Sequence, residues 1–186
     1  MSGLSHVNED GSPRMVDVSG KASTVRRAVA EGFVRLKPAH VAALDRLPKG
    51  DAITVAQIAG IQGGKRCSEL IPLCHPISLT HLDVRITRYS LEESGKRKVE
   101  SGKEGGDRGK RKEERGGRSM PESLRIEAEA RTEDRTGVEM EAYTAVVVAG
   151  ITLIDMLKGV DPDLEITGVR LLKKTGGKAD WKRGSA

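Results

Sequence analysis

The longest apolar segment, from Val138 to Val160, restricts the fold of this chain more than any other feature. Its large side chains recur at the spacing of a helix, at Tyr143, Val147, Ile151, Ile154 and Leu157. A helix that is apolar over so much of its surface must be largely buried. The rest of the chain therefore has to supply a surface that covers it.

Three segments with alternating hydrophobic and polar residues can form that surface. The alternation runs through Leu79 to Tyr89, through Leu124 to Arg131, and less regularly through Leu164 to Lys173. The first two segments pair naturally as an antiparallel hairpin. Helices packed on one face of a small antiparallel sheet predict an α+β fold.

The first third of the chain contains three further candidate elements. Val25, Val29 and Phe33 recur at helical spacing within Thr24 to Leu36, which predicts a helix there, although the segment is also rich in β-branched residues. Pro38 can begin a short helix that runs through Leu47. Asp51 can cap the next helix, which we expect to end at about Leu70.

A charged, low-complexity segment from Ser90 to Met120 interrupts the predicted hairpin. It carries ten Lys or Arg residues against seven acidic residues, so that the remainder of the chain accounts for only +2 of the net charge of +5. It has seven glycines and few apolar residues, and such a composition cannot offset its ordering entropy. We interpret it as a disordered, solvated insertion; a basic tether for acidic partners is the alternative. Deleting Leu91 to Met120 is expected to leave activity intact.

The bulk composition excludes several classes of protein. A length of 186 residues predicts one domain over 1–186, with the insertion at about residues 90–120 in a hairpin loop. Aromatic residues make up only 2% of the chain, which disfavours nucleic-acid binding by base stacking. No uninterrupted apolar stretch reaches the length of a membrane span, and the first residues lack the pattern of a signal peptide. Cys67 and Cys74 are expected to be free thiols in a reducing compartment, so we expect a cytoplasmic protein.

The loop from Ile71 to Pro76 is the first candidate for chemistry. Two prolines fix the backbone on either side of the pair Cys74 and His75, which presents an imidazole at low entropic cost. The alternative is a structural turn in which His75 only satisfies a backbone group. A zinc site is a weaker alternative because no recognised ligand spacing is present; its ligands would be Cys67, Cys74, His75 and His81.

Two glycine-containing segments could contact an anion. The segment Gly60 to Arg66 departs from a Walker A motif at both ends, but it leaves Lys65 and Arg66 beside small residues. Gly176, Gly177 and Lys178 follow Lys173 and Lys174 and form a flexible cationic segment. Solvated cations on a packed helix and on a tail are the alternatives.

Charged residues stand at both ends of the apolar helix, with Glu139 and Glu141 at its start and Asp155 and Lys158 near its end. Asp155 and Lys158 face each other at i, i+3, either as a structural ion pair or as a coupled acid and base. Fourteen residues separate Glu141 from Asp155, which corresponds to roughly 21 Å along a helix. One small ligand cannot touch both ends within one subunit. If both ends serve one reaction, the site must lie between subunits of an oligomer.

Six motifs together resemble one known family, the cyclic pyranopterin monophosphate synthases, or molybdenum-cofactor biosynthesis protein C family. The resemblance runs from about Leu4 to Lys178 apart from the insertion. The motifs are Arg14-Met15-Val16-Asp17-Val18, Lys49-Gly50-Asp51, Ile58-Ala59-Gly60-Ile61-Gln62, Leu70-Ile71-Pro72-Leu73-Cys74-His75-Pro76, Thr136-Gly137-Val138-Glu139-Met140-Glu141-Ala142 and Asp155-Met156-Leu157-Lys158.

This resemblance implies a ferredoxin-like α+β fold, in which Thr24 to Leu36 is a strand, and a homohexamer built as a trimer of dimers with active sites at the dimer interface. It implies a lyase whose substrate, 3',8-cyclo-7,8-dihydro-GTP, comes from a radical S-adenosylmethionine partner enzyme. The product is cyclic pyranopterin monophosphate, and pyrophosphate is released. No tightly bound cofactor and no protein metal site are implied, and Mg²⁺ enters only as a companion of the triphosphate.

The resemblance also implies the roles of individual residues. Leu73, Cys74 and His75 would line the substrate site together with Glu139, Met140 and Glu141. Asp155 would be the leading catalytic residue, with Lys158, Lys49 and His75. From the chemistry rather than from the motifs, we assign proton transfers to Asp155 and Lys158, and stabilisation of the phosphates to Lys49 and, less directly, to Lys21, Lys65 and Lys174.

Two other functions stay open from the sequence. The chain could be a catalytically idle relative that only holds the nucleotide or the partner enzyme, which product formation by purified protein would exclude. It could also bind nucleic acid through the insertion, which a filter-binding assay with steep salt dependence would reveal.

Overall fold

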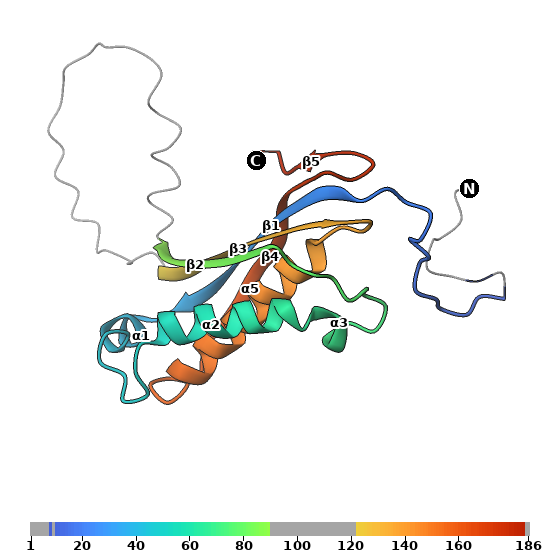
Figure 1. Cartoon of the computed structure of the whole chain (residues 1–186). Coiled ribbons are helices and arrows are strands. Elements are labelled where there is room, and N and C mark those ends of the chain that lie inside the picture. The colour runs from blue at the N-terminus through green and yellow to red at the C-terminus, as the bar shows by residue number, and fades with distance from the viewer. Residues whose placement is uncertain (1–7, 9, 90–121, 185–186) are drawn as a thin grey trace, which may run out of the picture.

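The computed structural model describes residue 8 and residues 10–89 and 122–184 (Figure 1). Its sheet has five antiparallel strands in the order β2-β3-β1-β4-β5. Their bounds are β1 Thr24–Leu36, β2 His81–Tyr89, β3 Glu122–Asp134, β4 Glu165–Thr175 and β5 Trp181–Lys182. A sheet of this order, with helices between β1 and β2 and between β3 and β4, is ferredoxin-like. The predicted α+β class is confirmed.

The helices cover one face of this sheet (Figure 1). They are α1 Pro38–Ala43, α2 Ala52–Lys65, α3 Cys67–Leu70 and α5 Glu139–Leu157. Buried side chains of α5 pack against the inward side chains of β1, β3 and β4 and against α2. By length and composition α5 could cross a membrane, but more than half of its apolar window is buried, as in the core helix of a globular domain.

Segment Thr24–Leu36 is strand β1, so the helix predicted from its periodicity is wrong and the strand implied by the resemblance is confirmed. Ala28, Ala30 and Val34 alternate inward and are at most 1% exposed. Val25, one of the three residues that suggested a helix, is 67% exposed on the opposite face. The alternation of hydrophobic and polar residues that is typical of a strand is weak in this sequence, because several inward residues are small and some outward residues are apolar.

The predicted helices differ from the observed ones mainly at their C-terminal ends. Helix α1 begins at Pro38, as predicted, but ends at Ala43 instead of Leu47. Asp51 caps α2 as predicted, because its carboxylate accepts hydrogen bonds from the backbone N–H groups of Ile53 and Thr54. The backbone at Arg66 leaves the helical region, so that the single helix predicted to Leu70 is divided into α2 and α3.

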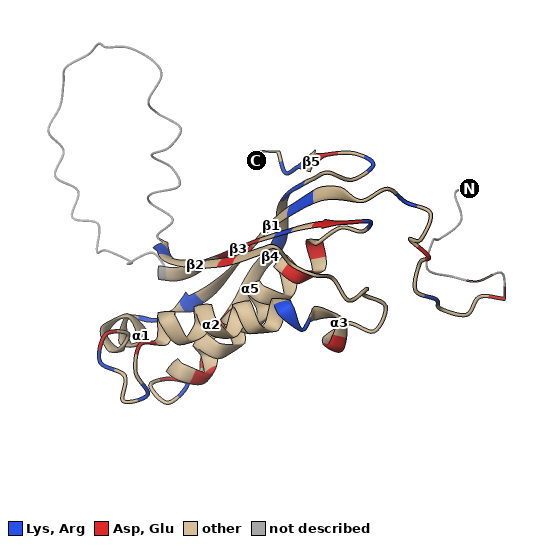
Figure 2. Cartoon of the chain, viewed as in Figure 1, with Lys and Arg blue, Asp and Glu red and all other residues tan. Residues whose placement is uncertain are grey.

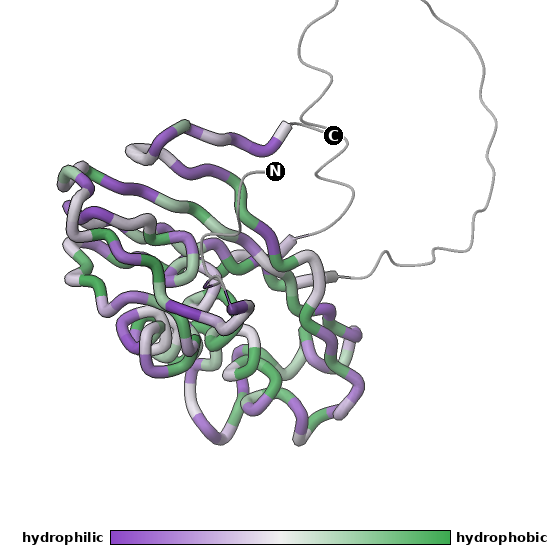
Figure 3. Tube along the Cα trace, turned by 90° about the vertical axis from the view of Figure 1, so that its right-hand side faces the viewer, coloured by the Kyte–Doolittle hydropathy of each residue, from purple (hydrophilic) through white to green (hydrophobic). Residues whose placement is uncertain are grey.

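Charged residues lie on the outer face of the sheet and at the helix ends, and the middle of α2 and α5 carries none (Figure 2). Figure 3 shows the corresponding alternation of hydrophobic and hydrophilic residues along the strands. On the outer face Glu31 is 4% exposed and accepts hydrogen bonds from Arg125 at 2.7 Å and Arg170 at 2.8 Å. Paired in this way, a buried carboxylate is tolerated on the sheet.

The hairpin of β2 and β3 is antiparallel, as predicted, and Tyr89 pairs with Ser123 at its end. The charged segment that joins the two strands lies outside the described residues, so the prediction of a disordered insertion stays a prediction.

Candidate functional site

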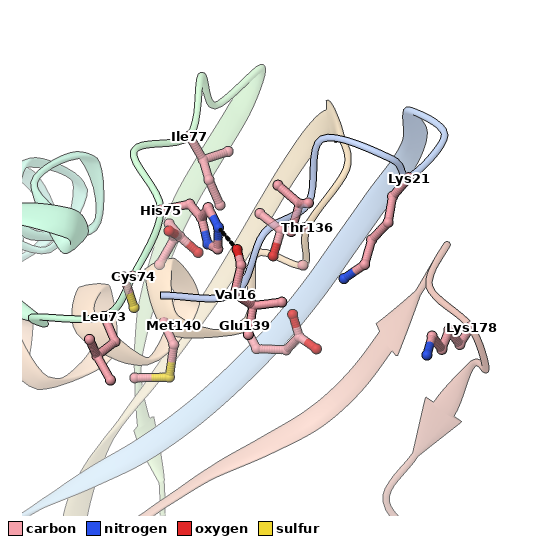
Figure 4. Close-up of a pocket in the computed structure, with 13 residues that line it drawn as sticks. Val16, Lys21, Leu73, Cys74, His75, Ile77, Thr136, Glu139, Met140 and Lys178 are labelled. Atoms are coloured by element: carbon pink, nitrogen blue, oxygen red, sulfur yellow. Dashed lines mark hydrogen bonds between the residues drawn. The ribbon is translucent and has the colours of Figure 1, made fainter. Parts of the chain in front are cut away.

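Two neighbouring cavities, each of about 440 Å³, lie where α5 begins. The first is bounded by the segment that precedes β1, called here the N-terminal arm, by the loop after α3 and by the first turn of α5 (Figure 4). Its lining consists of Val16, Val18, Lys21, Leu73, Cys74, His75, Ile77, Thr136, Gly137, Glu139, Met140, Glu141 and Lys178. The structure thus brings together seven residues that the sequence proposed for substrate binding, namely Lys21, Leu73, Cys74, His75, Glu139, Met140 and Glu141.

The loop after α3 holds the arm in place through His75. The Nε2 atom of His75 lies 2.7 Å from the carbonyl oxygen of Val16, and because a carbonyl only accepts, Nε2 carries the proton (Figure 4). A bond to a backbone group is what the structural interpretation of His75 required. The imidazole nevertheless also lines the cavity, so its catalytic role stays a prediction.

The second cavity shares a wall with the first and is strongly basic. Its charged lining residues comprise six cations against two acids, namely Lys21, Arg26, Arg27, Arg135, Lys174, Lys178, Glu139 and Asp180. The ammonium group of Lys174 lies 3.1 Å from the Glu139 carboxylate, so this pair joins the two cavities. Several cations around one hollow attract a multiply charged anion.

The first cavity differs in its electrostatics because the Glu141 carboxyl in its lining is buried and the Cys74 thiol is partly buried. Glu141 is only 4% exposed, and burial raises the pKa of its carboxyl group. Burial also raises the pKa of the Cys67 thiol to about 12 and raises that of Cys74. Both cysteines are therefore protonated near neutral pH, which makes them poor nucleophiles. The cavity can exchange protons through Glu141, but it holds no activated thiol.

A second cluster lies at the other end of α5 and contains three predicted catalytic residues. Asp155 forms ion pairs with Lys158 at 2.8 Å and with Lys49 at 3.3 Å. These two lysines, Lys158 foremost, lower the pKa of the Asp155 carboxyl. The pair at i, i+3 was expected from the spacing, whereas only the fold brings Lys49 to it from the turn before α2. All three side chains are about half exposed and accessible to a ligand.

The structure does not bring the two ends of α5 together within one chain. Glu141 and Asp155 belong to one unbroken helix, which holds them roughly 21 Å apart. Lys65 is exposed at the end of α2 and lines neither cavity. The first cavity and the Asp155 cluster are therefore separate from each other within one chain.

The sequence did not single out four residues of the basic cavity, Arg26, Arg27, Arg135 and Trp181. Arg26 and Arg27 are adjacent on β1 and Arg135 follows β3, but only the pairing of these strands shows that they lie side by side. Within the described ranges, no group of three or more His, Cys, Asp or Glu side chains is arranged to hold a metal ion.

Comparison with known proteins identifies relatives over nearly the whole chain. A family model described as the MoaC family matches residues 15–177. The cyclic pyranopterin monophosphate synthase of Corynebacterium efficiens is 46% identical over 184 residues, which cover 97% of this chain and 99% of that protein. The protein of the same name from Streptomyces coelicolor is 44% identical, and the match covers 97% of this chain and 89% of that protein. Molybdenum cofactor biosynthesis protein 1 of Drosophila melanogaster is also 44% identical, but the match covers 98% of this chain and only 27% of that protein.

Proposed function

The chain belongs to the MoaC family, and from that premise we propose that it converts 3',8-cyclo-7,8-dihydro-GTP into cyclic pyranopterin monophosphate, with release of pyrophosphate. The observation that carries this proposal is the pair of adjoining cavities, one with the buried carboxyl group of Glu141 and one lined by cations. A substrate with a polar ring system at one end and a triphosphate at the other can place the ring in the first cavity and the triphosphate in the second. The reaction makes the protein a lyase of molybdenum-cofactor biosynthesis.

The ring system of the substrate occupies the first cavity in this proposal. The backbone and side chains of Leu73 to His75 and of Glu139 to Glu141 surround it, where polar edges of the ring can pair with the carboxyl groups. The triphosphate then extends into the second cavity toward Lys21, Arg26 and Lys174. Arg27 is held by Glu129 at 2.8 and 2.5 Å and contributes its charge from a fixed position.

Asp155, Lys158 and Lys49 carry out the chemistry together with His75. An ionised Asp155 can accept a proton while the imidazole ring of the purine is opened and reclosed as a pterin. Cations beside the attacked phosphate stabilise the charge that develops when an internal hydroxyl displaces pyrophosphate. Lys49 and Lys158 are suited to this task because both already pair with Asp155.

The distance along α5 supports a site that is shared between chains. We place the Asp155 cluster of one subunit at the cavities of another, in a homohexamer built as a trimer of dimers with active sites at the dimer interface. Lys65, which lies outside the cavities of its own chain, would reach a site only in such an assembly.

The remaining partners follow from the chemistry. The proposed substrate is already cyclised, so a radical S-adenosylmethionine enzyme that acts on GTP must supply it. We propose a cytoplasmic protein without a tightly bound cofactor or a resident metal, in which Mg²⁺ arrives with the triphosphate.

The first test is product formation from 3',8-cyclo-7,8-dihydro-GTP by the purified wild type and by Asp155→Asn. The wild type should release pyrophosphate and form the cyclic phosphate, while the folded variant should be slower by about 10²- to 10⁴-fold. An inert wild-type protein that still binds the substrate would contradict the proposal and favour a binding function.

A second test addresses the shared site. Asp155→Asn and Glu141→Gln should each be inactive as pure proteins, and the two chains should be co-expressed so that they mix. If each site takes Glu141 from one chain and Asp155 from the other, about a quarter of the sites in an equal random mixture of dimers are intact. Activity no higher than that of the pure variants would contradict a site between subunits.

A further inference from the structure

At Leu172, strand β4 contains one residue more than the part of β1 that lies opposite it. Val29 of β1 is opposite Lys173. The next residue of β1, Ala30, is opposite Leu171, so Leu172 has no counterpart on β1. An extra residue of this kind is a β-bulge, and it moves the side chains that follow it to the other face of the sheet.

The bulge decides which of two adjacent lysines faces α5. Lys174 is opposite Ala28, whose side chain is 1% exposed on the face of the sheet that the helices cover. Directly opposite residues share a face, so Lys174 also points toward α5, and its ammonium group lies 3.1 Å from the Glu139 carboxylate. Lys173 points to the outer face and lines neither cavity. Without the extra residue the two lysines would exchange faces.

The residues around the bulge do not by themselves determine this choice. Two leucines are followed by two lysines, in the order Leu171, Leu172, Lys173 and Lys174. With or without the bulge, one lysine faces α5 and the other faces outward, so the hydrophobic pattern does not select between them. Contacts from outside the strand must therefore hold the bulge in place.

Such contacts reach the bulge from α5 and from the residue after β5. Tyr143 lies one turn after Glu139 on α5, and its hydroxyl oxygen accepts a hydrogen bond of 2.8 Å from the backbone N–H of Leu171. From the other side, the backbone N–H of Arg183 donates to the carbonyl oxygen of Leu172 at 2.8 Å. The Nε of Arg183 donates to the carbonyl oxygen of Leu171 at 2.9 Å. These bonds satisfy backbone groups where the bulge interrupts the regular ladder.

We propose that Tyr143 is a positioning residue for the reaction: it holds the bulge at Leu172, and the bulge keeps Lys174 directed at the second cavity, where the ammonium group binds the phosphates of the substrate. Tyr143 lines neither cavity, so it acts on the ligand through Lys174. This inference rests on the proposed function for the identity of the ligand. The placement of Lys174 can be measured without turnover, with inorganic tripolyphosphate as the probe.

Calorimetric titration of the full chain with tripolyphosphate gives the first readout. Lys174→Ala should raise the dissociation constant about 10-fold, because a hydrogen bond to a charged group is lost. Lys173→Ala removes the same charge from the adjacent residue and is the matched control, which should change the constant less than about 2-fold at physiological salt. Tyr143→Phe keeps the ring but removes the acceptor of the Leu171 N–H. It should raise the constant about 3- to 5-fold and make hydrogen exchange at Leu171 faster.

A double-mutant cycle shows whether Tyr143 acts through Lys174. Tyr143→Phe should have no further effect on tripolyphosphate binding in the Lys174→Ala background. An equal effect of Tyr143→Phe in both backgrounds, or none in either, overturns the positioning role. A loss of affinity in Lys173→Ala as large as that in Lys174→Ala overturns the selection of Lys174 by the bulge. A wild type that does not bind tripolyphosphate overturns the inference together with the assignment of the second cavity.

Steady-state kinetics separate this inference from the proposed function. Tyr143→Phe should raise KM by the factor found for tripolyphosphate and leave kcat within about 2-fold, because the lost contact is made in the ground state as well. A wild type without turnover that still shows the expected cycle contradicts the proposed function and supports the positioning of Lys174 toward a polyphosphate. An active wild type in which the effects of Tyr143→Phe and Lys174→Ala are additive overturns this inference alone.

Discussion

Replacing Gly63 by alanine is expected to destabilise the fold, although alanine is the better helix former. Gly63 faces α5 from the last turn of α2, and a Cβ atom added there would lie 2.6 Å from Cγ2 and 2.7 Å from Cβ of Val148. The Cβ of Val148 is bound to the backbone, so a change of rotamer cannot relieve the overlap and the two helices must move apart. Overpacking of this kind costs about 1–3 kcal/mol, while the helix propensity of alanine returns roughly 1 kcal/mol. Because no rotamer change relieves the overlap, the cost should lie in the upper half of that range, which leaves a net loss of about 1–2 kcal/mol in the free energy of unfolding.

Urea denaturation followed by circular dichroism measures this loss. Gly159→Ala is the matched control, because a Cβ atom there meets nothing within 4 Å, and its effect should stay within about 0.5 kcal/mol. Val148→Gly removes all three overlapping atoms, Cβ included, so the double variant with Gly63→Ala should be more stable than the sum of the two single effects by about 1 kcal/mol. A Gly63→Ala protein as stable as the wild type, or strictly additive effects, would refute this account of the contact between α2 and α5.

Four further predictions concern the site and its support. Asp155→Asn should leave the free energy of unfolding nearly unchanged, since its ion pairs are half exposed, and yet slow pyrophosphate release by about 10²- to 10⁴-fold. Burial raises the pKa of Glu141, so its ionisation weakens the fold as the pH rises through that pKa; thermal melts should therefore show Glu141→Gln to be more stable than the wild type in mild alkali and equal to it in acid. Lys174→Ala should raise KM more than it lowers kcat in steady-state assays, because it removes a cation from the basic cavity. His40 is fully buried and bonded through both ring nitrogens, so His40→Ala should cost about 2–4 kcal/mol in chemical denaturation.

The parts of the fold that the sequence predicted well are those with a strong period. Helix α5 is apolar over its whole length except at its ends, and β2 alternates regularly, so both were found within a few residues. Strand β1 was mistaken for a helix because its buried side carries Ala28, Ala30 and Gly32, whose small side chains give almost no hydrophobic signal. Strand β5 has only two residues and is defined by its pairing with β4, which no local pattern can indicate.

The site was predictable where its residues are close in sequence. The Cys-His loop and the two glutamates of α5 form compact motifs, and the structure brings both to one cavity. The basic cavity was missed in part because Arg26 and Arg135 meet only through the pairing of β1 with β3, across more than a hundred residues.

The stiffness of α5 links the fold to the proposed assembly. Its backbone is hydrogen-bonded from end to end, and its buried side is fixed between the sheet and α2, where Gly60 and Gly64 allow the two helices to approach closely. Bending it far enough to bring Asp155 to Glu141 would break both the helix and the core. Loop motion cannot close the distance either, because both residues lie on the helix itself. A reaction that uses both carboxyl groups must therefore obtain the second one from another chain, and on this proposal activity depends on assembly rather than on a conformational change within one subunit.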